Sequence, residues 1–307
     1  MNEHVPVLLQ EAIHYLDLHD DGTYVDATLG GGGHSEAILR QLRKGRLFAF
    51  DQDDYALERA KTRLKHFDNV VFIRDNFRNL RARLQEQGVD SVDGILFDLG
   101  VSSFQFDIPE RGFSYQFDAP LDMRMDPSGE LDARQIVNEY PEARISEILF
   151  RYGEEPFARK IARKIVEARA KTPIATTFQL VDTVKSALPE KVLRQKGHPA
   201  KQTFQALRIA VNDELRALEA ALQQAIQILK PAGRLVTITF HSLEDRICKT
   251  IFRDFATINV PKGLPVLITE KPVLKLLTKH VVTPSEAEIL ANNRAHSAKL
   301  RAVEKTG

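Results

Sequence analysis

The sequence contains a single cysteine, no long apolar run and almost no net charge. Because Cys248 stands alone among 307 residues, neither an internal disulfide nor a cysteine-based zinc site can form, and a reducing cytoplasm is the expected compartment. No apolar run approaches the roughly 18 residues that span a bilayer, and no signal-peptide pattern opens the chain, which argues against membrane insertion and secretion. The 43 basic and 42 acidic side chains leave a formal net charge of +1, which neither requires nor excludes a nucleic-acid partner.

The first hundred residues alternate short apolar strands with helical segments. This alternation predicts βαβ units around a parallel, doubly wound sheet, which binds ligands beyond the carboxyl ends of its strands. The predicted strands are 24–29, 46–50, 70–73 and 93–97, and the predicted helices are 34–43, 54–66 and 79–87. Asp53 or Asp54 is the expected N-cap of the second helix. An apolar fraction of 43% suits such a globular protein.

The pattern changes at about residue 107. A loop rich in Gly, Pro, Asp and Phe at 107–129 precedes helical segments, and no strand is predicted up to about residue 200. One long helix is then expected from Gln202 to Leu229, ended by Pro231–Gly233, and strands at 234–240 and 300–303 follow. We therefore expect one α/β domain in two parts, 1–106 and 201–307, interrupted by a helical insertion at 107–200.

A run of four glycines, Gly30 to Gly33, follows the first strand and allows a ligand to approach the backbone closely. Asp51 ends the second strand about 20 residues later, where a carboxylate suits the two hydroxyls of a ribose. A tight turn with Asp51 as a helix cap is the alternative. The imperfect G-x-G-x-x-G pattern, together with Asp26 placed to meet an ammonium group, favours S-adenosylmethionine over NAD. Phe77, after the third strand, either flanks an adenine ring or packs in the core.

Six blocks of sequence together resemble the bacterial RsmH (MraW) family, and the resemblance covers nearly the whole chain. The blocks are Asp26–Ser35, Asp98–Ser103, Glu110–Ser114, Leu121–Pro127, Thr203–Ile209 and Phe240–Arg246. Members of that family are S-adenosylmethionine-dependent methyltransferases that act on N4 of a decoding-centre (P-site) cytidine in 16S ribosomal RNA. Their fold is a Rossmann-like methyltransferase sheet with an inserted helical domain.

The resemblance carries further expectations for this chain. It implies S-adenosylmethionine as cofactor, 16S ribosomal RNA as partner within the small ribosomal subunit, and substrate recognition by the insertion. No membrane or metal site is expected, and a homodimer is compatible with it. The cofactor contacts that it implies are Gly32, Gly33, His34, Asp51, Phe77, Asp98 and Gln105.

Transfer of a methyl group to a cytosine amine requires a near-attack geometry and acceptors for the amine hydrogens. Asp98, at the end of the fourth strand, either accepts a hydrogen bond from N4 or binds the methionine ammonium group; a cap of the following turn is the structural alternative. Methylation at C5 needs a cysteine nucleophile after that strand, whereas Cys248 is predicted on a later helix. Cysteine-dependent C5 methylation is therefore set aside, and N4 as the target is what the resemblance implies.

A second polar segment follows the strand at 234–240. Ser242 and Asp245 have the spacing of a capping box, which leaves His241 and Arg246 unexplained and makes both candidates to face the nucleotide. His241 is accordingly a candidate catalytic residue, although the methylated amine is acidic enough to lose its proton to water.

Basic side chains gather in the insertion. One predicted helical arc contains Arg159, Lys160, Arg163, Lys164 and Lys171, opposite Phe157, Ile161, Ile165 and Ala168. A second basic stretch contains Lys191, Arg194, Lys196, His198 and Lys201. The candidate RNA contacts are Arg159, Lys160, Arg163, Lys164, Lys196 and Arg246, and a merely solvated helix face is the alternative.

Two other classes of protein remain possible on the residues alone. An NAD-dependent oxidoreductase fits the glycine loop, and a non-catalytic RNA-binding assembly factor fits the basic insertion. The joint presence of Gly32, Asp51 and Asp98 argues against the second class, because a vestigial pocket does not need them.

Overall fold

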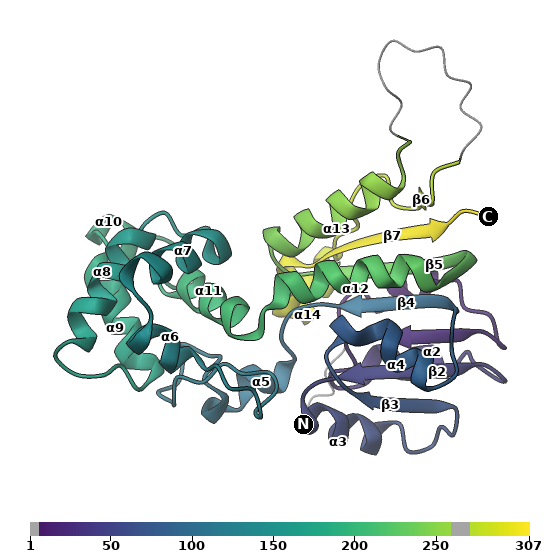
Figure 1. The fold of residues 1–307 in the computed structure, drawn as a ribbon, viewed down its shortest axis with the longest axis horizontal. Coiled ribbons are helices and arrows are strands. Elements are labelled where there is room, and N and C mark those ends of the chain that lie inside the picture. Colours follow the sequence, from purple (N-terminus) through teal and green to yellow (C-terminus); the bar gives the residue numbers. More distant parts are fainter. Residues whose placement is uncertain (1–5, 259–270) are drawn as a thin grey trace, which may run out of the picture. The chain divides into compact units, whose positions relative to one another are not determined.

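The computed structural model describes residues 6–258 and 271–307 and is shown in Figure 1. The chain divides into two compact units: Met1–Gly100 with Leu215–Gly307, and Val101–Glu214. The second unit is wider at both ends than the predicted insertion at 107–200. Within the two described ranges, no helix combines the length and the apolar content that a membrane span requires.

The first unit contains a seven-stranded sheet in the order β3-β2-β1-β4-β5-β7-β6. The strands are β1 (Thr23–Asp26), β2 (Arg46–Asp51), β3 (Val70–Arg74), β4 (Val92–Asp98), β5 (Leu229–Thr239), β6 (Leu274–Leu276) and β7 (Lys299–Lys305). Strands β1 to β5 pair in parallel, and β7 is antiparallel to both β5 and β6. The predicted doubly wound α/β sheet is confirmed, and each strand predicted from the sequence is present.

Helices cover both faces of this sheet (Figure 1). Alternate residues of a strand point to opposite faces, and here both sets are apolar, so both faces must be covered. On one face, Phe48 of β2 and Phe97 of β4 pack with α4 (Leu80–Glu86), α12 (Glu214–Ile228) and α13 (Ser242–Phe255). On the other face, Leu47 and Leu96 pack with α1 (Leu9–Leu16), α2 (Gly33–Leu39) and α3 (Asp54–Arg63). The unit is completed by two 3-10 helices and a short helix: η1 (Phe77–Asn79), α14 (Glu286–Ala291) and η3 (Asn293–Ser297).

The long helix predicted over 202–229 is wrong. The chain forms α11 (Lys201–Asn212) and then α12, separated by Asp213 in the left-handed conformation with φ 48°. Asn212 accepts a hydrogen bond from the N–H of Met125 and donates one to the carbonyl of Met123, so that it holds a loop at the break. Because the helical spacing of apolar residues continues across Asp213, the sequence pattern gives no sign that the helix is interrupted there. Strand β5 also begins earlier than predicted, at Leu229.

The second unit is helical and has its own apolar core. Its elements are α5 (Ser103–Asp107), η2 (Pro109–Arg111), α6 (Ala133–Glu139), α7 (Glu142–Gly153), α8 (Ala158–Arg169), α9 (Thr177–Ala187), α10 (Glu190–Leu193) and α11. Helices α7, α8, α9 and α11 pack in the neighbouring pairs α11–α7, α7–α8 and α8–α9. Because α11 packs on α7, residues beyond 200 belong to this unit.

The glycine loop turns directly from β1 into α2. Gly30 and Gly32 have φ values of 50° and 76°, which side chains disfavour, and Gly32 is the N-cap of α2. Gly33 is needed for a different reason, since a Cβ atom there would overlap Cγ of Pro6. A Cβ atom at Gly31 would have nothing within 4 Å. Gly30 and Gly32 are therefore required by their backbone conformation and Gly33 by close packing, whereas Gly31 has room for a side chain.

We expect Gly33→Ala to lower the free energy of unfolding by about 1–3 kcal/mol, the usual cost of overpacking. Gly31→Ala is the matched control, because its added methyl group meets open space. Chemical denaturation of both variants measures the difference. Equal stability of the two variants would contradict the tight contact between Pro6 and Gly33.

Candidate functional site

Three carboxylates lie at the carboxyl ends of neighbouring strands in the first unit. Asp26 ends β1, Asp51 ends β2 and Asp98 ends β4, and these strands are adjacent in the order β2-β1-β4. Parallel pairing aligns their ends, with Asp26 opposite Ala49 of β2 and Leu96 of β4. The edge at which a doubly wound sheet binds its ligand is therefore rich in acceptors.

Asp51 faces the glycine loop. Its Oδ2 accepts a hydrogen bond from the N–H of Gly30 and its Oδ1 accepts one from the N–H of Asp53, each at 2.9 Å. The N-cap of α3 is Asp53, which accepts from the N–H of Tyr55, so Asp51 is not the helix cap. Burial raises the pKa of Asp51 to about 7 even though the two hydrogen bonds lower it. Each carboxylate oxygen keeps a second lone pair with which to accept from a ligand.

Asp26 is engaged within the protein, and its predicted contact with an ammonium group stays a prediction. Its side chain is fully buried, and it accepts hydrogen bonds from the hydroxyl of Ser35 at 2.6 Å and from the N–H of Thr28 at 3.1 Å. Burial raises the pKa of Asp26. Its role in the structure is to tie the end of β1 to the first turn of α2.

Asp98 keeps one oxygen without a partner. Its N–H donates to the hydroxyl of Thr28 at 2.6 Å, and its Oδ2 lies 3.4 Å from Nδ1 of His34. Among the described residues, its buried Oδ1 accepts no hydrogen bond. A buried acceptor without a donor is costly, and it marks a place where a ligand group can donate. Its side chain is not engaged as a cap of the following turn.

His34 and Phe77 are both engaged within the first unit. His34 is buried in the first turn of α2, where both ring nitrogens have partners within the protein, so a ligand can meet only its main chain. Phe77 begins η1 and lies edge-on to Phe97, with ring centroids 5.7 Å apart. Its predicted core packing is present, and its exposed part stays a candidate for contact with an adenine ring.

Gln105 belongs to the second unit. It is buried in α5, where its Oε1 accepts from the N–H of Ser102 at 3.1 Å in a capping box. Its cofactor contact therefore stays a prediction from the resemblance.

The helix cap predicted at Ser242 lies one residue earlier. His241 is the N-cap of α13, and Glu244 is its partner in the capping box. The N–H of Glu244 donates to Nδ1 of His241, and Nε2 of the ring lies 3.0 Å from Oε1 of Glu244. Capping therefore accounts for Nδ1 of His241, which the sequence left unexplained because histidine is not a usual cap residue. The buried Nε2 makes no hydrogen bond among the described residues, and the catalytic role of His241 stays a prediction. Asp245 instead pairs with Arg301 at 2.7 Å, and Arg246 is exposed on α13.

The predicted basic arc lies on α8. Ile161 and Ile165 are fully buried, while Arg159, Lys160 and Arg163 are exposed on the helix. Lys164 is tied to Glu167 at 2.7 Å, which reduces its availability for phosphate.

The second basic stretch contributes less charge than predicted. Lys196 is exposed, but the His198 ring stacks on Tyr115 with centroids 4.2 Å apart, and burial lowers its pKa. Arg194 pairs with Glu190 at 2.6 Å. Lys191, Lys196 and Lys201 are exposed, as is Arg194, whose charge is offset by Glu190.

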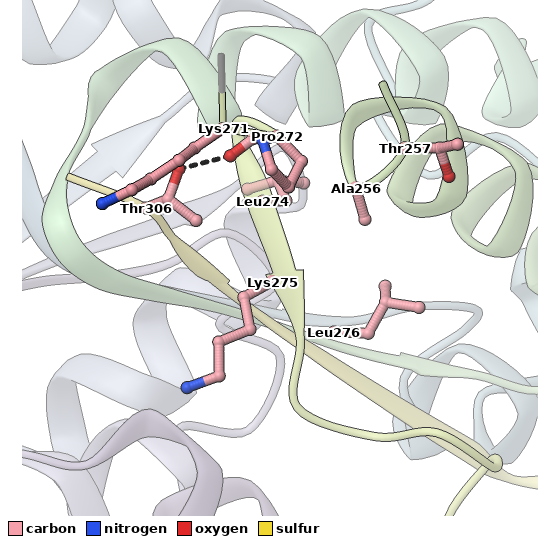
Figure 2. Close-up of a pocket in the computed structure, with 8 residues that line it drawn as sticks. All are labelled: Ala256, Thr257, Lys271, Pro272, Leu274, Lys275, Leu276 and Thr306. Atoms are coloured by element: carbon pink, nitrogen blue, oxygen red, sulfur yellow. Dashed lines mark hydrogen bonds between the residues drawn. The ribbon is translucent and has the colours of Figure 1, made fainter. Parts of the chain in front are cut away.

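A shallow cavity of about 420 Å³ lies elsewhere in the first unit, where the end of α13 meets β6 and the last residues of the chain (Figure 2). Ala256, Leu274 and Leu276 supply apolar lining, and the Thr306 hydroxyl donates to the carbonyl of Pro272. Because β7 runs antiparallel to β5, with Glu304 opposite Arg234, this cavity is near the amino ends of the parallel strands. It contains none of the predicted site residues.

Cys248 is fully buried in α13, and burial raises its pKa to about 12. A thiol of this kind is not a nucleophile at neutral pH. The exclusion of cysteine-dependent C5 methylation therefore agrees with the structure.

Two residues missed by the sequence analysis hold the candidate site together. Thr28 and Ser35 supply the hydroxyls that meet the main chain of Asp98 and the carboxylate of Asp26. Both lie inside the block Asp26–Ser35, but a hydroxyl in a loop gives no sign of its partner. Together with the glycine loop, these contacts form a candidate nucleotide-cofactor site at the edge of a doubly wound sheet.

Comparisons with known proteins identify the class of enzyme. The model of the MraW methylase family matches residues 1–306. The ribosomal RNA small subunit methyltransferase H of Streptococcus equi subsp. equi (strain 4047) is 55% identical over 307 residues, covering 98% of this chain and 97% of that protein. The chain therefore belongs to the MraW methylase family, whose members are S-adenosylmethionine-dependent methyltransferases. The predicted resemblance and cofactor are confirmed, and the NAD alternative is wrong.

Two solved structures are more distant. An rRNA methylase from Streptococcus thermophilus is 14% identical with a TM-score of 0.43, covering 98% of this chain and 93% of that one. A methyltransferase from Streptococcus mutans, in complex with SAH, is 12% identical with a TM-score of 0.43, covering 98% of this chain and 99% of that one. Scores at this level are too low to establish a common fold.

Proposed function

We propose that this methyltransferase modifies N4 of the P-site cytidine in 16S ribosomal RNA of the small subunit. The observation that carries the substrate class is the 55% identity, over almost the full length of both chains, with a protein named as a small-subunit ribosomal RNA methyltransferase. The six blocks that resemble the family support the choice of N4. The acceptor-rich edge formed by β1, β2 and β4 supports the chemistry.

The cofactor fits the residues present at that edge. When bound, S-adenosylmethionine supplies a methyl group from a sulfonium centre. Asp51 accepts from the ribose hydroxyls, and Gly32, Gly33 and His34 lie at the start of α2. The N–H of Gly32 donates to the carbonyl of Leu29, whereas the N–H groups of Gly33 and His34 lie in the first helical turn, where the helix itself offers no acceptor. The exposed part of Phe77 flanks the adenine ring.

Asp98 acts on the amine that receives the methyl group. Its buried Oδ1 accepts a hydrogen bond from an N4 hydrogen, which fixes the direction of the nitrogen lone pair. Bound S-adenosylmethionine would supply the methyl group and keep the bonding electron pair on sulfur, so positive charge would develop on N4 beside Asp98. The carboxylate stabilises this charge, and the nitrogen then loses a proton to water. The proposed step assigns no role to His241, whose Nδ1 accepts from the N–H of Glu244 at the N-cap of α13.

Nucleoside mass spectrometry tests this function. Purified protein is incubated with methyl-labelled S-adenosylmethionine and either naked 16S ribosomal RNA or small subunits from cells that lack the gene. We expect label in N4-methylcytidine, which chromatography separates from 5-methylcytidine. Label in another nucleoside would contradict the N4 assignment, and absence of label from both substrates would favour a non-catalytic assembly factor.

The pKa of Asp51 predicts a pH-dependent cofactor affinity. Ribose hydroxyls favour the ionised carboxylate, so a protein that is protonated at Asp51 must lose that proton in order to bind. The affinity for S-adenosylhomocysteine should therefore fall as pH drops below about 7, by up to about tenfold per pH unit. Calorimetry from about pH 8 to pH 6 measures this. Asp51→Asn should bind more weakly with little pH dependence; an unchanged slope in that variant would remove Asp51 from the ribose site.

Asp98→Asn should slow methyl transfer by about ten- to a thousandfold while cofactor affinity changes much less. The amide keeps the shape and one acceptor but lacks the negative charge that favours the cationic nitrogen. Single-turnover methylation at saturating S-adenosylmethionine gives the rate, and calorimetry gives the affinity. If the loss is in affinity and the saturated rate is preserved, Asp98 binds the methionine ammonium instead.

The exposed arginines on α8 are expected to contact RNA phosphates. Arg159→Glu combined with Arg163→Glu should weaken RNA binding and reduce the slope of log affinity against log salt by roughly 1–2. Arg43→Glu combined with Lys44→Glu is the matched control, because these exposed cations lie before β2, away from the carboxyl ends of the strands. An equal loss in both double variants would indicate only a general effect of net charge.

A further inference from the structure

The His34 ring lies between two hydrogen-bond acceptors. Its Nε2 is 3.2 Å from the carbonyl oxygen of Val7, and its Nδ1 is 3.4 Å from Oδ2 of Asp98. A carbonyl oxygen only accepts, so Nε2 must carry a hydrogen; a carboxylate also accepts, so Nδ1 carries one as well. The ring is therefore arranged to donate from both sides, as an imidazolium does.

The charges around the ring support that state. Burial by itself lowers the pKa of His34, but the hydrogen bond and charge of Asp98, the charge of Asp26 and the Val7 carbonyl outweigh it, and the pKa is raised. A cation in this position is compensated by two carboxylates.

The far side of the ring is anchored by the segment that precedes α1. Pro6 packs against Gly33, and the N–H of Leu8 donates to Oε1 of Glu288 at 2.7 Å. Val7 is thus fixed on both sides along the chain, which fixes the carbonyl that His34 meets. Through its two contacts, the His34 ring connects the fixed carbonyl of Val7 with the carboxylate of Asp98.

One carboxylate oxygen of Asp98 is not held by any described residue. Its main chain is held by Thr28 and its Oδ2 by His34, whereas its Oδ1 has no partner among the described residues. Rotation about the side-chain bonds would move Oδ1 away from any fixed target. Among the described residues, the contact with His34 is the one side-chain contact of Asp98 that opposes this rotation.

We propose that His34 is a positioning residue for Asp98: its ring, anchored on the Val7 carbonyl, holds Oδ2 so that Oδ1 meets the amine that receives the methyl group. The inference rests on the proposed role of Asp98. It gives the His34 side chain a task distinct from the cofactor contact of its main chain.

Two amide substitutions separate the two contacts of the ring. The amide nitrogen of His34→Asn lies near the position of Nδ1 and can still donate to Asp98. The amide nitrogen of His34→Gln lies near the position of Nε2 and can still donate to Val7. We expect His34→Gln to slow single-turnover methylation by about ten- to a hundredfold, with His34→Asn recovering much of that loss and with similar affinities for S-adenosylhomocysteine.

A double-mutant cycle tests whether His34 acts through Asp98. His34→Gln combined with Asp98→Asn should be about as slow as Asp98→Asn alone, because the second substitution removes the group that the first one misplaces. Single-turnover rates at saturating S-adenosylmethionine give the four corners of the cycle. Melting temperatures of the four proteins show that each is folded under the assay conditions.

The outcomes are distinct. If Asp98→Asn is slow but His34→Gln is as fast as the wild type, or if the two effects multiply, the positioning role is wrong and the proposed role of Asp98 stands. Slower methylation by His34→Asn than by His34→Gln would also overturn the positioning role. If Asp98→Asn is fast at saturation, the proposed role of Asp98 fails, and the inference fails with it.

Discussion

The parallel pairing of β1 with β4 is the constraint on which the candidate site depends. Asp26 lies opposite Leu96, so Asp98 lies two residues beyond the last position of β4 that pairs with β1. Side chains two apart on a strand share a face, and Leu96 packs on the face covered by α1, α2 and α3. Asp98 therefore points toward α2, where His34 lies. A shift of one residue in this register would turn Asp98 to the opposite face and separate the pair.

The same edge concentrates negative charge, and the structure compensates it in three ways. Asp51 accepts hydrogen bonds from the main-chain N–H groups of Gly30 and Asp53. Asp26 accepts one from the Ser35 hydroxyl, and Asp98 contacts the His34 ring. Burial nevertheless raises the pKa values of Asp26 and Asp51. A cofactor that brings hydroxyl donors and a positive charge improves this balance. The acids therefore favour ligand binding at some cost to the free protein.

The proposed function gives the two units different chemical tasks. The first unit provides fixed acceptors on strand ends, where packing on both faces of the sheet holds them. The second unit provides exposed cations on α8, carried by a helix whose apolar side is buried in a separate core. Recognition of a polyanion tolerates mobile lysine and arginine side chains, whereas a methyl transfer does not tolerate a mobile carboxylate.

By itself, the sequence determined the doubly wound sheet, the glycine loop after β1 and the acids that end β1, β2 and β4, because alternation and turn residues are local signals. The contact between His34 and Asp98, the capping of α13 by His241 and the burial of Asp26 were decided only by tertiary structure. So was the break at Asp213, where Asn212 turns to Met123 and Met125 while the apolar spacing runs on unchanged. In each case the partner is fixed by strand register or by packing between elements, and a local pattern of residues contains no information about which distant group a polar side chain will meet.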